Sequence, residues 1–229
     1  RKVAQLKNFP VGKSPPIVYM TGQKNISLGK SETDVLRAFL IEKHGMLFAD
    51  NGGSAHWGNQ FKALMGRVLP KVSYIRVPLD HPIHRVPYPI PFLPYVAPHG
   101  GTDALAWVVD GRIAAYYHPG DIGDAWADDH AGVPTPIWEA CYQLGTNVIF
   151  YAHAEYNKWL DSRKKYRACT RTHAPGPKAS YSTSSAAGFA KNRTGHVLVP
   201  PHCPWPESEK FDLKRGKKPD RACTRTPHC

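Results

Sequence analysis

The sequence predicts an α/β fold, in which an open, mostly parallel sheet is flanked by helices and followed by an extended, basic, proline-rich tail. Residues 17–22 and 46–50 are short apolar runs that end in Gly22 and in Asp50-Asn51-Gly52-Gly53, a pattern typical of buried strands. Between them, residues 31–44 carry apolar side chains on one helical face. A strand, a helix and a second strand in this order predict a parallel, right-handed unit.

The helix between these two strands has a signal at each end. Ser31 and Asp34 have the spacing of a capping box, with Asp34 in the place of the usual Glu or Gln. We therefore expect the helix to begin at Ser31. Gly45 suits the left-handed residue that ends a helix.

A second helix, a third strand and a proline-rich loop follow. Ser54 is the expected N-cap of the helix, Pro70 ends it, and residues 74–79 are expected to form the strand. Prolines recur through residues 82–102, which predicts an extended loop lying over the body. The core face of the second helix is expected to hold Trp57, Phe61, Leu64, Met65 and Val68.

A hairpin and a last helix complete the predicted body. Asp110-Gly111 is a strong hairpin signal between the apolar runs 105–109 and 112–117, and residues 121–132 read as a polar loop. Thr135-Pro136 opens the helix, which we expect to end near Leu160. Its core face is expected to hold Ile137, Trp138, Cys141, Leu144, Val148 and Ile149.

Charge divides the chain into a body, residues 1–160, and a tail, residues 161–229. The body has 15 Lys and Arg against 13 Asp and Glu, a net of +2, and the tail has 15 against 5, a net of +10, which together give the +12 of the chain. A body of this length can bury a full core, whereas a tail rich in Pro, Ser, Lys and Arg cannot build one alone. No apolar run approaches the roughly 20 residues that cross a bilayer. We expect the tail to contact a protein partner or another anionic surface.

The cysteines follow the same division. Cys141 lies in the body, and Cys169, Cys203, Cys223 and Cys229 lie in the tail. Four tail cysteines allow two disulfides with three possible connectivities, which favours an oxidising compartment. A zinc site with His202 and His228 is the alternative, although no Cys-x-x-Cys pair is present. We expect a periplasmic or envelope-associated protein whose signal peptide has been removed.

Polar side chains gather where the predicted strands end. The carboxyl ends of parallel strands meet at one edge, where open α/β sheets bind ligands. Each side chain also has a structural interpretation, because Asp and His beside Gly or Pro commonly close turns or cap helices. The ligand-binding candidates are Asp50, Asn51, Asp80, His81, Arg112, His118, Asp121 and Asp124.

Motifs for covalent catalysis and for nucleotide hydrolysis are missing. The sequence has no Gly-x-Ser-x-Gly elbow and no P-loop, and Cys141 falls on a buried helix face. His81 and His118 lack the i, i+4 partner of a helical zinc motif, so no cofactor is predicted, with a divalent metal ion as the alternative. The tail aromatics are not interleaved with its basic residues as stacking platforms, which disfavours nucleic-acid binding.

The body resembles a bacterial family of unassigned activity, domain-of-unknown-function family 4159, over about residues 15–155. The resemblance implies a fold similar to class I glutamine amidotransferase-like domains, often in envelope-associated proteins, but the amidotransferase nucleophile has no counterpart here. The polar positions that it implies are Asp50, Asp80, His81, Arg112, Asp121 and Asp124. The motifs that carry it are 19–22 (YMTG), 36–40 (LRAFL), 45–50 (GMLFAD), 61–65 (FKALM), 78–83 (PLDHPI), 110–112 (DGR), 121–126 (DIGDAW) and 144–152 (LGTNVIFYA).

Three functions are compatible with these observations. The first is a non-catalytic binding or scaffold subunit of a bacterial envelope assembly, whose tail wraps a partner. The second is a metal-assisted hydrolase or polar-ligand enzyme that uses the strand-end Asp and His residues. The third is nucleic-acid binding through the basic tail. We expect the first, because no nucleophile is evident and the charge is concentrated in a segment that cannot fold alone.

Overall fold

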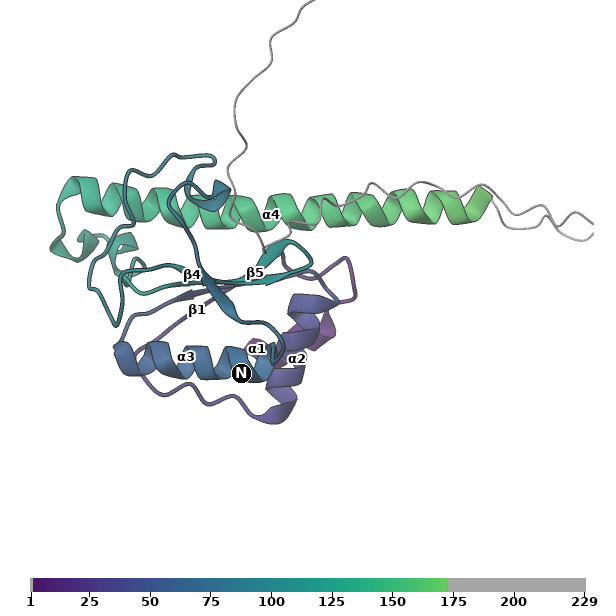
Figure 1. The fold of residues 1–229 in the computed structure, drawn as a ribbon, viewed down its shortest axis with the longest axis horizontal. Coiled ribbons are helices and arrows are strands. Elements are labelled where there is room, and N and C mark those ends of the chain that lie inside the picture. Colours follow the sequence, from purple (N-terminus) through teal and green to yellow (C-terminus); the bar gives the residue numbers. More distant parts are fainter. Residues whose placement is uncertain (1, 173–229) are drawn as a thin grey trace, which may run out of the picture. The chain divides into compact units, whose positions relative to one another are not determined.

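The structure, a computed structural model, describes residues 2–172 of the chain, whose elements are shown in Figure 1. The helices are α1 (Lys2–Gln5), α2 (Lys30–Ile41), α3 (Ala55–Val68) and α4 (Thr135–Thr172), and the strands are β1 (Ile17–Thr21), β2 (Met46–Asp50), β3 (Tyr74–Arg76), β4 (Leu105–Val109) and β5 (Arg112–His118). Short 3-10 turns are η1 (Leu6–Asn8), η2 (Pro82–His84), η3 (Asp124–Trp126) and η4 (His130–Gly132).

The five strands form one sheet in the order β1-β2-β5-β4-β3. β1 pairs with β2 and β2 pairs with β5 in parallel, while β4 is antiparallel to both β5 and β3. β4 therefore runs against the other four strands. The predicted parallel pair of residues 17–22 and 46–50 and the predicted hairpin are both confirmed, and the protein is an α/β protein with a mixed sheet.

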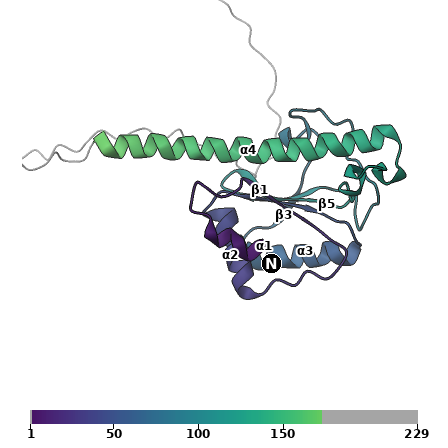
Figure 2. The ribbon, with the colours of Figure 1, turned by 180° about the vertical axis from the view of Figure 1, so that it is seen from behind.

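Helices cover both faces of the sheet (Figures 1 and 2). On one face, α2 and α3 bury Leu36, Phe39, Leu64 and Met65 among others against the sheet. On the other face, α4 buries an apolar stripe that includes Leu144. The central strand β2 is buried along its whole length, as expected for a strand covered on both sides.

The start of α2 differs from the prediction. Gly29, not Ser31, is the N-cap, and its N–H donates to the Glu32 carboxylate at 3.0 Å. The Glu at N3 is thus the capping-box acid, whereas Asp34 forms ion pairs with Lys30 and Arg37 on the helix surface. The sequence contains two overlapping capping patterns, and the one with the longer Glu side chain forms.

The end of α2 also differs. The left-handed residue is His44, with φ 56°, and not Gly45. Glycine is required at 45 for another reason, because a Cβ there would lie 2.1 Å from the Phe39 ring. Gly45 therefore allows close packing of the chain against the helix, and His44 takes the strained backbone conformation while stacking on Trp159.

Both edge strands differ from the prediction. β1 is only partly buried, and its Tyr19 side chain is 43% exposed. β3 is exposed throughout and ends at Arg76, before the predicted end at Leu79. Pro78 cannot donate a ladder hydrogen bond, which explains why pairing stops early.

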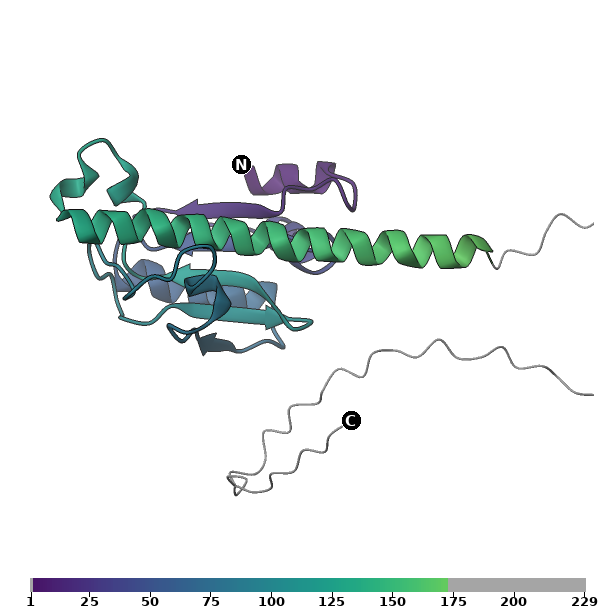
Figure 3. The same cartoon turned by 90° about the horizontal axis from the view of Figure 1, so that it is seen from above.

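The remaining predicted helices form with some corrections. α3 is capped by Ser54, whose Oγ accepts from the Trp57 N–H at 3.3 Å, and its predicted core face is buried. α4 begins at Thr135 but continues to Thr172, past the predicted end near Leu160 (Figure 3). Ile149 was assigned to its core face wrongly, since its side chain is 49% exposed. Residues 161–172 hold no Gly or Pro, and the ion pair of Asp161 with Lys164 supports that turn.

Two irregular segments are attached to the body by specific hydrogen bonds. Asn147 on α4 bonds both backbone groups of Tyr88, which fixes the proline-rich loop as another strand would. Lys43 donates to the carbonyls of Leu6 and Lys7 and so fixes the N-terminal segment. Within residues 2–172, no helix has the length and hydropathy of a membrane span.

Candidate functional site at the carboxyl edge of the sheet

Three parallel strands end side by side at one edge. Thr21, Asp50 and His118 are in register at the ends of β1, β2 and β5. The predicted meeting of strand-end polar groups is therefore confirmed for Asp50 and His118. The loop after β5 brings Asp121 to the same edge, because Thr21 Oγ1 and Asp121 Oδ1 both lie close to Gly52.

Asp50 is fully buried and uses both carboxylate oxygens within the protein. Oδ1 accepts from the Ile122 N–H at 3.1 Å, and Oδ2 accepts from the Gly123 N–H at 2.7 Å and from the Tyr19 hydroxyl at 3.0 Å. Burial raises the pKa of Asp50 to about 6, against the lowering effect of these three donors. Asp50 thereby holds the loop after β5 against β1 and β2.

Asn51 is also fully buried, and both polar atoms of its side chain form hydrogen bonds within the protein. Its two amide N–H groups are shared among three acceptors, the carbonyls of Ser54 and His99 and the Tyr117 hydroxyl, which lie 2.9, 2.6 and 2.9 Å from Nδ2. Its amide oxygen accepts from the N–H groups of Gly53 and Ser54. This side chain shapes the turn into α3 and joins it to the proline-rich loop.

His118 is buried beneath that loop. Its Nδ1 accepts from the Gly120 N–H at 3.0 Å, and its ring stacks on Tyr95 with the centroids 5.5 Å apart. Nε2, which then carries the proton, has no hydrogen-bond partner among the described residues. Burial lowers the pKa of His118 to about 3, so the ring is neutral at physiological pH.

The rim of this edge is formed by Asp121, Asp124 and His99. The Asp121 carboxylate is buried, and its Oδ2 lies 3.5 Å from His99 Nε2. Burial and the nearby charge of Asp124 raise the pKa of Asp121, whereas His99 lowers it. Asp124 itself is exposed. Sequence analysis missed His99, which carries no local motif and reaches the site only because its loop folds back against residues 119–120.

The structure places Asp80 and His81 away from this edge. Asp80 is exposed in the loop after β3. His81 caps η2, where its Nδ1 accepts from the Ile83 N–H at 3.1 Å, and its ring lies 6.1 Å from that of Tyr151 on α4. His81 shares a surface hollow with Gly111 of the β4–β5 turn, at the opposite end of the hairpin from His118.

Arg112 also lies at the opposite edge. It opens β5, is buried, and donates from Nη1 to the Gly45 carbonyl at 3.0 Å and from Nη2 to the Leu40 carbonyl. These bonds tie the end of α2 and the entry to β2 to the hairpin. The guanidinium therefore donates to backbone carbonyls, and it lies too far from the carboxyl edge to contact a ligand bound there.

The metal and tail predictions are only partly within reach of the described residues. In the described part, no three His, Cys, Asp or Glu side chains are grouped so as to hold a metal ion. Cys169 lies in the last turns of α4, and the disulfide candidates Cys203, Cys223 and Cys229 lie outside the described residues. The zinc alternative rests on residues beyond 172, and the nucleic-acid alternative rests on the tail, residues 161–229, most of which lies beyond 172; both stay predictions. Cys141 is a buried free thiol whose pKa is raised to about 12 by burial.

Comparison with protein families matches residues 6–153 to one family, described as Domain of unknown function (DUF4159). The match covers the sheet, α2, α3 and about half of α4. It agrees with the resemblance drawn from the sequence motifs. No curated protein matches the chain.

Proposed function

The chain belongs to the family of domain of unknown function DUF4159, and we propose that it is a non-catalytic binding or scaffold subunit of a bacterial envelope assembly. In this proposal the α/β body docks on a protein partner, and the basic residues 161–229 extend across that partner. The family description assigns no activity, so support comes from the residues themselves.

The main observation in support of this proposal is that the side chains of Asp50 and Asn51 already have hydrogen-bond partners within the protein on all their polar atoms. Both lie where an α/β enzyme would place ligand-binding groups, and both form their hydrogen bonds with backbone groups and neighbouring side chains of the fold. A ligand at Asp50 would have to displace three donors from a buried carboxylate, each loss costing about 1 kcal/mol or more. The edge is therefore better suited to fixing loops than to turnover.

Exposed apolar side chains on α4 support a docking role. Tyr142, Ile149 and Phe150 are each at least 40% exposed and follow the i, i+7, i+8 spacing of one helix face. These side chains lie outside the buried stripe of α4 that packs on the sheet. Apolar side chains that gather on one surface favour contact with a partner over exposure to water.

Purification from the native source without denaturant tests this function. We expect the protein to elute with a stable partner, identified by mass spectrometry, and residues 173–229 to resist protease in that complex but not after its dissociation. A protein that is a lone monomer in every extract, with this segment cleaved equally before and after dissociation, would overturn the proposal.

A second candidate, a metal-assisted hydrolase or polar-ligand enzyme, is favoured by the rim of the carboxyl edge. There the buried Asp121 carboxylate lies 3.5 Å from the partly exposed His99 ring, and both residue types are used in acid–base and metal chemistry. Metal analysis of the native protein, and calorimetric titration of Mn²⁺ or Zn²⁺ into it and into Asp121→Asn, test this candidate. Stoichiometric metal that is lost in the variant would support it, and the absence of metal and of binding would remove it.

A further inference from the structure

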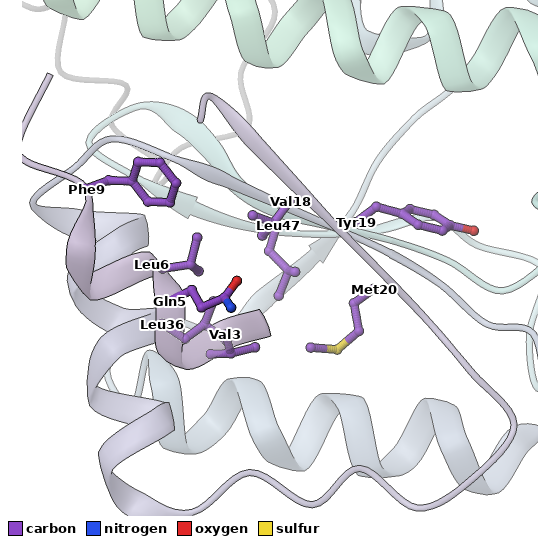
Figure 4. Close-up of a pocket in the computed structure, with 9 residues that line it drawn as sticks. All are labelled: Val3, Gln5, Leu6, Phe9, Val18, Tyr19, Met20, Leu36 and Leu47. Carbon is purple, nitrogen blue, oxygen red and sulfur yellow. The ribbon is translucent and has the colours of Figure 1, made fainter. Parts of the chain in front are cut away.

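The outer side of β1 is the free edge of the sheet. Residues 17–21 pair with residues 46–50 on one side, and no described strand pairs with the other side. Backbone groups along a free edge are open to an added strand, which is a common mode of peptide recognition. Tyr19 does not block the edge, because Figure 4 shows its ring directed away from the other labelled side chains, and its hydroxyl bonds Asp50.

An apolar cavity of about 300 Å³ adjoins this strand (Figure 4). It lies between β1 and the N-terminal segment and is lined mainly by Val3, Leu6, Val18, Met20, Leu36 and Leu47. Phe9, at its rim, is 41% exposed. The volume is sufficient for one or two large apolar side chains.

A second hollow continues the first along the strand. It has a volume of about 510 Å³ and extends from Met20, which lines both hollows, past Thr21 and Gly22 to Trp57. Together the two hollows adjoin residues 18–22. An extended chain, which rises about 3.3 Å per residue, matches this arrangement better than a compact ligand does.

The positive charge around β1 favours a partner segment that carries acidic residues. Residues 1–31, which include β1 and the N-terminal wall of the cavity, contain six Lys and Arg and no Asp or Glu. Lys7, Lys13 and Lys24 are exposed on this part of the body. Acidic flanks on an added strand would be attracted here, whereas a second copy of this chain would bring the same positive charge and be repelled.

We propose that the free edge of β1 binds an extended segment of a partner protein as an added strand. Apolar side chains of that segment fill the cavity beside Val18 and Met20, and acidic residues on either side of it face Lys7, Lys13 and Lys24. This inference rests on the proposed binding function and names where and by what chemistry the partner is held.

The first experiment uses the full chain and a defined probe. The probe is a fluorescent peptide of about ten residues with alternating Val and Thr and two Asp at each end, matched by a peptide with Lys in place of Asp. We expect the acidic peptide to bind at least about tenfold more tightly and to slow amide hydrogen exchange in residues 17–21. Absence of binding, equal binding of the two peptides, or binding without protection of residues 17–21 would overturn the inference.

Variants separate the cavity from the charges. Val3→Phe narrows the cavity, and the triple variant Lys7→Glu, Lys13→Glu and Lys24→Glu reverses the charge; each should weaken acidic-peptide binding by about tenfold or more. The control triple variant Arg67→Glu, Lys71→Glu and Arg85→Glu makes the same charge change elsewhere on exposed residues. It should change affinity by less than about twofold. Circular dichroism confirms that each variant is folded, and a control that weakens binding equally would overturn the role of these lysines.

Cross-linking of the native assembly distinguishes this inference from the function on which it rests. Lysine-reactive cross-links from Lys7, Lys13 or Lys24 to an acidic, extended segment of the partner support the inference. A partner cross-linked only at other sites would overturn the inference and leave the binding function standing, and the absence of any partner would overturn both. Concentration-dependent dimerisation that Val3→Phe abolishes would mean that a second copy occupies the edge, which also contradicts the inference.

Discussion

The Tyr19 hydroxyl donates a 3.0 Å hydrogen bond to the buried Asp50 carboxylate and so joins the edge strand β1 to the central strand β2. The same carboxylate accepts from the backbone of Ile122 and Gly123, which follow β5. One side chain thus connects β1, the end of β2 and the loop that follows β5. Since desolvation of a carboxylate is costly, this position is maintained only because every oxygen is paired.

Asp50→Ala should lower the free energy of unfolding by roughly 2–4 kcal/mol, because it leaves the buried Ile122 N–H and the partly buried Gly123 N–H without their acceptor. Urea denaturation followed by circular dichroism measures this loss. Asp80→Ala is the matched control, since Asp80 is exposed, and it should stay within about 0.5 kcal/mol of the parent. Equal stability of the two variants would contradict the structural role of Asp50.

Two buried histidines should make the protein less stable in mild acid. Burial lowers the pKa of His118 to about 3 and that of His84 to about 4, below the ordinary value near 6.5 of an unfolded chain. The unfolded state therefore binds these protons first, so their contribution is complete above about pH 6.5 and is lost as pH falls to about 4 for His84 and about 3 for His118. The pKa of Asp50, raised to about 6, has the opposite sign and partly offsets the loss between about pH 6 and 4.

The free energy of unfolding, measured in urea at several pH values, should fall by at most about 1.4 kcal/mol per pH unit for each histidine. His118→Asn retains an acceptor for the Gly120 N–H, but the Asn side chain does not titrate. The free energy of unfolding of this variant should therefore change less with pH than that of the parent protein. His56→Asn changes an exposed histidine and should leave the slope unaltered. A slope that is the same in both variants would mean that His118 is not buried and neutral.

The sequence predicted those elements whose signals are local. The helical spacing of apolar residues predicts α3, and Asp110-Gly111 predicts the β4–β5 turn. Both signals lie within the element itself, and both predictions are confirmed. The same turn places Arg112 at the start of β5, so its distance from His118 could have been inferred from strand length. His99 could not have been inferred, because its position depends on the path of a long loop. The Asp50 network likewise depends on a loop, at residues 122–123, that lies 72 residues or more along the chain.

Gly45 and Gly66 give a matched test of glycine requirements. Gly45→Ala should lower the free energy of unfolding by about 2 kcal/mol or more, because its methyl group would lie 2.1 Å from the Phe39 ring in a buried core. Gly66→Ala lies in an exposed turn of α3 with no atom within 4 Å of the added carbon, so it should stabilise the protein by about 1 kcal/mol. Thermal unfolding of both variants measures the contrast. A neutral Gly45→Ala would show that the chain can move away from Phe39.

Thiol chemistry tests the proposed oxidising location. The Cys141 side chain is fully buried, and burial raises the pKa of its thiol to about 12, so iodoacetamide should not label it in the folded protein. If Cys169, Cys203, Cys223 and Cys229 form two disulfides, denaturation without reductant should expose one reactive thiol, and denaturation with reductant should expose all 5 cysteines. Mass spectrometry of protein from the native source counts the labels, and Cys141→Ala should remove the single thiol. Rapid labelling of four cysteines in the native, unreduced protein would contradict both the disulfides and the envelope location, whereas labelling that begins only after chelation would assign these cysteines to zinc.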